Sequence, residues 1–407
     1  MSISGWGGWD DRGNGTELQR NRMSGGTIAG RFDATGRAST FVARVSTSPN
    51  SYRQTFTAVN ASRTAEFLTS TQTTDTLATR AVAEVGRAVS RGHIVARGEL
   101  SRASADFTDV RSASTAELSL SDRREAVSMQ AAFQPSATFS LNGGARHEWR
   151  AAPEDVDGRD TATVGHARAV WNVDGSWYLR GSVASSHRWP TLNELVRGFR
   201  VGNVITQPNP GLRPEKALSW DGAIAWEARR WQMSVGGFWT DVEDAIANVT
   251  LSSGATIIRE RQNAGDTRSR GLEVDAEVRP GGGSRIRGSL ALTSATFVTS
   301  AEPVLVGNDL PQVPGVAFSL WADVPLPHAM VATGVLRAIS TQFDDDRNNY
   351  ELASATQLDL ALAGRIGIFG WRVELENAFD AAIEVGRTPL VTLAPPRTFR
   401  IGFTVGR

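Results

Sequence analysis

Apolar and polar residues alternate with a period of two along much of the chain, most clearly between residues 177 and 239. In the segment 177–184, Trp177, Leu179 and Val183 share one face, and polar or small residues share the other. This period predicts a β-strand. The segment 219–227 repeats the pattern, with a tryptophan at each end of its apolar face. Such a face is typical of a lipid-facing strand in a transmembrane barrel, where aromatic side chains lie at the level of the lipid headgroups.

In the C-terminal half, the same alternation places a charge at every second position. The segment 272–279 is apolar at even positions and charged at odd positions, and the segment 371–376 shows the reverse. An arginine facing lipid near the bilayer centre would cost about 2–4 kcal/mol, so these charges must face water. A soluble β-sandwich would satisfy the same condition. The number of strands, the loop lengths and the tryptophan positions together favour the membrane barrel.

Short and long connections alternate along the chain. The short ones are tight turns rich in Gly, Pro, Asp or Asn, such as 33–36, 172–176 and 280–284. The long ones are polar: 10–15, 103–112, 150–161, 187–215, 299–314, 343–353 and 380–396. Outer-membrane barrels have short periplasmic turns and long extracellular loops. We therefore predict an all-β fold, an antiparallel transmembrane β-barrel of about 20–22 strands that forms a single domain. That domain is expected to span residues 1–407.

The alternation is weaker in the N-terminal half. Residues 50–79 are rich in Thr and Ser, and we expect a hairpin turn near residues 60–63. Residues 112–133 are expected to form one strand that projects beyond the bilayer, because a second turn there would leave an odd number of strands.

Composition narrows the possible functions. The chain has 43 basic and 43 acidic residues, so no broad basic surface is available to attract nucleic acid. It has no cysteine, which excludes disulfides, thiolate metal sites and cysteine nucleophiles. No run of about 18 apolar residues predicts a membrane-spanning helix. The N-terminus lacks a basic region followed by an apolar run, so we expect no signal peptide in this chain.

Two spaced motifs lie between the strand segments described first. Arg188-Trp-Pro-Thr-Leu-Asn-Glu-Leu195 is followed by Asn209-Pro-Gly-Leu-Arg-Pro-Glu215. Together and in this order they resemble a signature of TonB-dependent outer-membrane receptors, R-x-P-T-x-x-E-L and then N-P-x-L-x-P-E before a strand. The residues that carry the resemblance are Arg188, Pro190, Thr191, Glu194, Leu195, Asn209, Pro210, Leu212, Pro214 and Glu215. The alternative interpretation is a proline-rich surface loop, since Pro and Asn mark any turn.

Segments nearer the C-terminus resemble the same family. They correspond to its N-x-G…G-x-E segment, its V-x-N-L-F-D element and its last strand, and the matching residues are Asn263, Gly271, Glu273, Asn377, Phe379, Asp380, Pro396 and Arg397. The resemblance is strongest over residues 177–407. The chain departs from the family in ending with Arg407 in place of an aromatic residue, and we expect no plug domain in it.

The resemblance implies a receptor and transporter of the bacterial outer membrane, not an enzyme. Its function would be energy-dependent uptake of a ferric siderophore or a similar large, scarce solute, such as cobalamin or a glycan. The expected partners are outer-membrane lipid, this ligand and, through an N-terminal part outside this chain, the TonB energy-transducing complex. We expect a monomer with no bound cofactor and no nucleic acid. Without a plug, a passive channel or a nonfunctional fragment is the alternative, and a soluble extracellular multi-strand protein is a third.

No local pattern predicts catalysis or a metal site. The five histidines, at positions 93, 147, 166, 187 and 328, lack the spacing of metal ligands. Asp344-Asp-Asp346 could hold Ca²⁺ through its oxygens. The spaced-ligand pattern of a calcium site is absent, so a solvated loop is the favoured interpretation.

Ligand contacts are expected in the loop 187–215. The candidates are Arg197, Phe199, Arg200 and Asn203, because they are long or hydrogen-bonding side chains at the expected barrel mouth. Arginine can pair with carboxylate or catecholate oxygens of an anionic chelate. Alternatively, the loop packs against its neighbours and its signature residues fix a turn. The sequence leaves both interpretations open.

Overall fold

The computed structural model describes residues 1–60, 62, 64–151, 159–201, 203–387 and 390–406. They form two compact units: unit 1 is Met1–Pro135 with Leu141–His166, and unit 2 is Ser136–Ser140 with Ala167–Arg407. Over these residues, 18 strands belong to one large sheet. No helix in the described ranges is long and apolar enough to cross a membrane. The expectation of a single domain over residues 1–407 stays a prediction.

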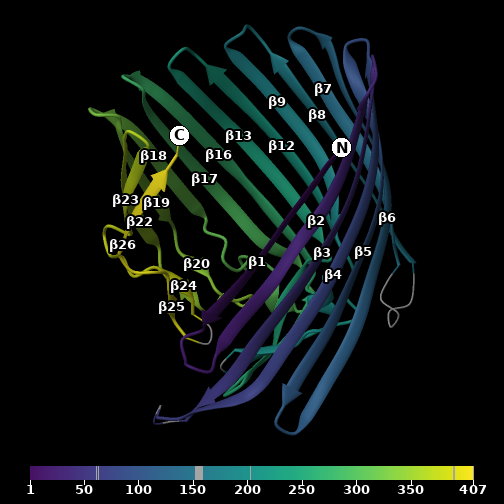
Figure 1. The fold of residues 1–407 in the computed structure, drawn as a ribbon, viewed down its shortest axis with the longest axis vertical. Helices are drawn as coiled ribbons and strands as arrows, with labels where there is room; N and C mark the ends of the chain where they lie inside the picture. The colour runs from purple at the N-terminus through teal and green to yellow at the C-terminus, as the bar shows by residue number, and fades with distance from the viewer. Residues whose placement is uncertain (61, 63, 152–158, 202, 388–389, 407) are drawn as a thin grey trace. The chain divides into compact units, whose positions relative to one another are not determined.

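Unit 1 consists of long strands joined by tight turns (Figure 1). From β1 to β6 each strand pairs antiparallel with the next. A strand needs about 9–11 residues to cross a bilayer. Since β3 to β6 have 21, 24, 20 and 23 residues, they continue well beyond that length. The strands are β1 (Ser2–Gly13), β2 (Arg20–Thr35), β3 (Ser39–Val59), β4 (Glu66–Val89), β5 (Gly92–Arg111), β6 (Ser114–Ser136), β7 (Phe139–Ala151) and β8 (Arg159–Asn172). The end of β6, the start of β7 and the second part of β8 belong to unit 2.

Three of the expectations concern unit 1. The long loop predicted at residues 103–112 is wrong, because β5 and β6 stay paired up to Arg111 and Ser114. Outside lipid a strand needs no apolar face, so its sequence resembles a polar loop. The single strand expected near residues 112–133 is confirmed by β6. The expected hairpin falls between Val59 and Glu66, although positions 61 and 63 lie outside the described residues.

Unit 2 has shorter strands and longer connections. From β9 to β26 each strand of the large sheet pairs antiparallel with the next one in this order. Connections at one end are tight turns such as 228–230 and 282–283, whereas those at the other end are long. The strands are β9 (Trp177–Arg188), β12 (Glu215–Glu227), β13 (Trp231–Glu243), β16 (Asp266–Gly281), β17 (Ser284–Thr299), β18 (Val316–Leu326), β19 (Met330–Ile339), β22 (Ala355–Ile366), β23 (Phe369–Glu376) and β26 (Thr398–Val405).

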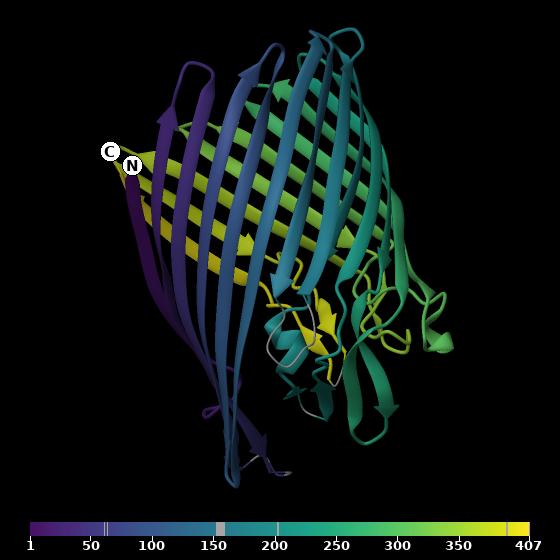
Figure 2. The same ribbon diagram turned by 90° about the vertical axis from the view of Figure 1, so that its right-hand side faces the viewer.

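The long connections of unit 2 fold into small elements beyond one end of its long strands (Figure 2). Four strands form a separate sheet in the order β10-β11-β15-β14. The alternation in β14 and β15 is strand-like, but these strands pair with loop strands. This is one reason why the large sheet has 18 strands and not about 20–22. The elements are α1 (Leu192–Val196), β10 (Phe199–Val201), β11 (Val204–Gln207), β14 (Ile246–Ser253), β15 (Ile257–Asn263), η1 (Pro303–Leu305), β20 (Gln342–Phe343), β21 (Glu351–Leu352), β24 (Glu384–Gly386) and β25 (Thr392–Leu393).

The register of unit 2 gives its sheet one apolar and one polar face. Ile224 lies opposite Val235, and Val235 lies opposite Val274, so apolar side chains continue from strand to strand. Ile224 and Val235 are about half exposed. On the other face Phe238 lies opposite Gly271, where a Cβ atom would come within 2.7 Å of the Phe238 ring and 2.1 Å of the Leu292 carbonyl oxygen. Only glycine fits there, which explains the glycine of the signature.

Candidate functional site

The first signature motif joins the ends of two strands to the start of a helix. Arg188 ends β9, and its guanidinium binds the carboxylates of Glu215, at the start of β12, and Glu194. Thr191 caps α1, and its hydroxyl and the Glu194 carboxylate form a reciprocal capping box. Burial opposes the ionisation of Glu194, but hydrogen bonds from Arg188 and Thr191 outweigh it and hold the pKa of Glu194 below its usual value.

The second motif is fastened to the β14–β15 hairpin. The Asn263 amide accepts the Arg213 N–H at 2.9 Å and donates to the Arg213 carbonyl at 3.0 Å and to the Asp244 carbonyl at 2.7 Å. The Leu212 side chain is buried, as are those of Pro190 and Leu195 in the first motif. The signature residues of this loop therefore act on each other and on the backbone, which supports the interpretation that they fix its turns.

The C-terminal signature builds another turn. Asn377 and Asp380 both have left-handed φ angles, of 50° and 53°, which Asn and Asp tolerate better than most residues. The buried Asn377 amide bonds the Ala381 N–H and carbonyl, each at 2.9 Å. The Asp380 carboxylate accepts the Arg397 N–H at 3.0 Å. The Pro396 carbonyl accepts a hydrogen bond from the Thr398 hydroxyl. The side chains of Phe379 and, on β16, Glu273 are exposed.

The four candidate ligand residues lie around the turn from α1 to β11. The Arg197 N–H closes α1 on the Asn193 carbonyl at 3.1 Å, and the Asn203 amide donates to the Ala255 carbonyl at 3.2 Å. The ring of Phe199 lies against an arginine of β15. The side chain of Arg200 lies outside the described part of the structure. The four remain a prediction as ligand contacts, and none of them is among the lining residues of the cavity beside this turn.

That loop cavity has a volume of about 430 Å³ and is enclosed by four parts of unit 2 that are distant in sequence. They are the start of α1, the β14–β15 hairpin, the connection between β17 and β18, and the loop after β20. The lining residues are Thr191, Asn193, Glu194, Ile246, Ala247, Asn248, Arg259, Arg261, Pro311, Asp344, Asp345 and Asp346. The two arginines are two positions apart on β15 and so share one face. This spacing was the signal in the sequence that could have identified them.

Arg261 holds α1 against the loop sheet. Its guanidinium is buried and donates to the carbonyls of Asn193 at 2.8 Å and Arg197 at 2.7 Å, where the helix ends. It also lies 5.3 Å from the centre of the Phe199 ring. Burial lowers the pKa of Arg261; the charge of Glu194 opposes this effect and that of Arg197 adds to it. The guanidinium of Arg261 therefore has its partners within the protein.

The acidic loop, Asp344-Asp-Asp346, was expected to be solvated, and this expectation is wrong. Asp345 and Asp346 are 4% and 3% exposed. Asp346 accepts the Thr250 N–H at 3.2 Å and the Thr250 hydroxyl at 3.0 Å, which ties the loop to β14. Asp345 accepts the Asn349 and Tyr350 N–H groups, both at 2.9 Å. These carboxylates are buried because they satisfy backbone donors that would otherwise be left unpaired.

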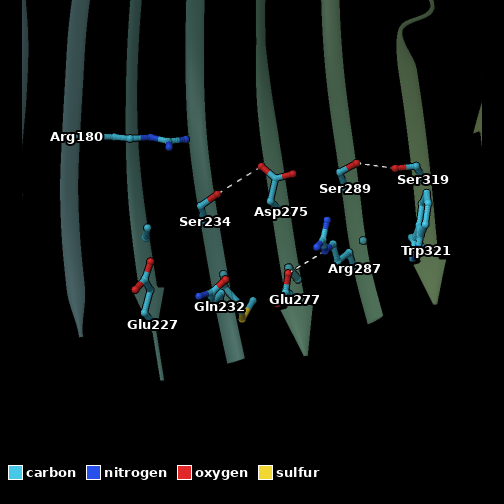
Figure 3. A pocket seen from close by; sticks show the side chains of 14 residues that line it. Arg180, Glu227, Gln232, Ser234, Asp275, Glu277, Arg287, Ser289, Ser319 and Trp321 are labelled. Atoms are coloured by element: carbon cyan, nitrogen blue, oxygen red, sulfur yellow. Dashed lines mark hydrogen bonds and ion pairs between the residues drawn. The ribbon is translucent and has the colours of Figure 1, made fainter. Parts of the chain in front are cut away.

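A second hollow, of about 470 Å³, lies on the polar face of the large sheet in unit 2 (Figure 3). Among its lining residues Glu277 binds Arg287 at 2.9 Å, and Glu277 also binds Arg279 and Arg285, which lie outside the lining, at 2.8 and 2.6 Å. Arg180 extends from β9 toward β13 along this face. The hollow is lined by regular strands, whereas the loop cavity is built from chain-distant segments.

A family model described as "TonB dependent receptor-like, beta-barrel" matches residues 3–382. The chain belongs to this family. Its members are bacterial outer-membrane receptors and transporters, so we assign the chain to that membrane as an antiparallel transmembrane β-barrel. The apolar face of its sheet is then the lipid-facing one, and the short turns and long loops are periplasmic and extracellular.

The chain is also similar to individual proteins, over different shares of its length. The ferrichrome outer membrane transporter/phage receptor of Escherichia coli (strain K12) is 31% identical over 126 residues, which are 28% of this chain and 16% of that protein. The copper transporter OprC has a TM-score of 0.78 at 14% identity, over 98% of this chain and 72% of that one. The ferric yersiniabactin uptake receptor FyuA of Yersinia pestis has a TM-score of 0.71 at 15% identity, over 95% and 61%. The chain thus spans about three fifths of that receptor's length, and at this identity the structures show a shared fold.

Proposed function

We propose that this chain is the barrel of a receptor that captures a ferric siderophore, or a similar large and scarce solute, for energy-dependent uptake. The observation that carries the proposal is the loop cavity at the long-loop end of unit 2. Its volume of about 430 Å³ lies in the range of small-molecule sites, and its lining is mainly polar, with nine charged or hydrogen-bonding residues beside Ile246, Ala247 and Pro311. Family membership supports the transport role.

Each expected partner has a separate role in this function. Lipid covers the apolar face, the metal chelate is the cargo, and the TonB complex supplies energy through a part of the protein beyond these 407 residues. We propose a monomer in which residues 1–407 form one domain. No step of bond making or breaking on the cargo is required.

Uptake of radioactive iron by cells that lack their own iron receptors tests this function. Cells exporting the chain, joined to whatever N-terminal part its gene encodes, should accumulate iron from ferric chelates only with an intact TonB complex and an energised inner membrane. Uptake that persists without either would favour the passive channel, and a large steady conductance in planar bilayers would support that outcome. No uptake from any chelate would contradict an iron-transport role.

A further inference from the structure

Arg259 lines the loop cavity, and its side chain has no partner among the residues that the structure describes. Its guanidinium makes no hydrogen bond or ion pair with any described residue, and its Nε atom is buried. The backbone around it is well ordered by pairing, because Arg259 lies opposite Thr206 on β11 and Thr250 on β14. A rigid strand therefore presents an unused cationic group to the cavity.

The other charged groups of the cavity are already occupied. Arg261 donates to two helix carbonyls, and Glu194 is bound by Arg188 and Thr191. The three carboxylates of the acidic loop also accept protein donors, including two hydrogen bonds to Asp344, from Gln312 and from the Arg387 N–H, both at 2.8 Å. A ligand would thus meet carboxylates that already accept hydrogen bonds from the protein and one guanidinium that donates none to the described residues.

We propose that Arg259 recognises an anionic oxygen pair on the ligand, such as a carboxylate or a catecholate, and so selects anionic metal chelates over neutral ones. A planar guanidinium matches two such oxygens, and a partly buried one gains more from them than an exposed one does. This inference rests on the proposed function for the nature of the ligand. Arg259 would be a specificity-determining residue of the loop cavity.

Equilibrium binding to the complete 407-residue chain in detergent tests the inference. The probes are a ferric tricatecholate, ferric citrate, iron-free citrate and a neutral ferric trihydroxamate. R259M keeps an apolar stem and removes the charge, and R259K keeps the charge without the planar fork. Arg102, exposed on β5 of unit 1, gives a matched control, since R102Q also removes one positive charge.

We expect R259M to weaken binding of the anionic chelates by about 10- to 100-fold, the value of a charge-assisted hydrogen bond. R259K should recover part of this loss, and R102Q should bind like the wild type. Binding of the neutral chelate should be weak and unchanged in every variant. Far-UV circular dichroism of each variant checks that the β-structure has formed.

Three results would overturn the inference: equal binding of anionic chelates by R259M and wild type, tighter binding of the neutral chelate by wild type, or no binding of any probe. Tight binding of only the neutral chelate would leave the iron-uptake function standing. Binding of iron-free citrate, lost in R259M, without binding of any ferric chelate would support the role of Arg259 and contradict the iron-uptake function.

Discussion

Unit 1 has unusually long strands, whereas unit 2 has long connections that fold into small elements. In unit 1, β3 to β6 continue as paired strands of 20 to 24 residues. Their ion pairs lie along one strand, as for Arg124 and Asp122, or run diagonally to the next strand, as for Arg80 and Glu99 at 2.7 Å. In unit 2, the loops join side chains as far apart as Thr250 and Asp346, which are separated by 96 positions. The strand wall of unit 1, β1 to β7, therefore pairs many of its own charges, whereas a cluster of loops can enclose a cavity that contains an unused cation.

The largest expected effect comes from breaking the charge pairing of the wall. The Asp122 carboxylate binds Arg150 at 2.7 Å and Arg124 at 2.5 Å, and both Asp122 and Arg150 are almost fully buried. Asp122→Asn should lower the free energy of unfolding by about 3–5 kcal/mol, because it removes a buried carboxylate that binds two arginines. Urea unfolding in detergent, followed by circular dichroism, measures this.

Asp75 provides the control for that experiment. It is exposed on β4 and has no ion pair among the described residues. Asp75→Asn should change the free energy of unfolding by about 0.5 kcal/mol or less. Equal losses in the two variants would mean that pairing in the wall does not stabilise unit 1.

A smaller effect is expected from releasing the acidic loop. Asp346→Asn replaces one acceptor oxygen by a donor that faces the donors of Thr250, and should destabilise this attachment by about 1–3 kcal/mol. Hydrogen exchange should become faster at residues 343–353 and along β14 while the strands of unit 1 keep their protection. Glu351→Gln, at an exposed position of the same loop, should change neither. Uniformly faster exchange would show that the loop and the wall do not open independently.

The smallest effect is the pH dependence of the α1 cap. Because the pKa of Glu194 is lowered in the folded protein, its contribution is complete above the unfolded value of about 4.3 and is lost as the pH falls through the folded value. Partial exposure limits this contribution to about 1 kcal/mol or less. The protection of the amides at residues 191–197, measured against the intrinsic exchange rate at each pH, should fall on acidification in the wild type. Glu194→Gln should exchange faster at neutral pH and respond less to acid, and an identical pH response would contradict this.

Much of the large sheet was predictable, because the alternation of a strand is a local property of the sequence. The faces of β12, β13 and β16 follow from a period of two, and the tight turns follow from Gly and Asp residues. The segments 50–79 and 103–111 were harder, since a strand outside lipid has no apolar face to reveal it. The loop signature of Arg188, Thr191 and Glu194 was recognised as a motif, but its capping and ion-pair role became visible only in the structure.

The sequence by itself determined the fold class, the family and the two faces of the sheet, since each depends on residues within one strand or one motif. Tertiary structure decided how many strands join the large sheet, and it decided that Arg259 faces the acidic loop after β20. The physical reason is that pairing between distant segments depends on which loops close on each other and which buried donors need acceptors. No local period encodes that choice.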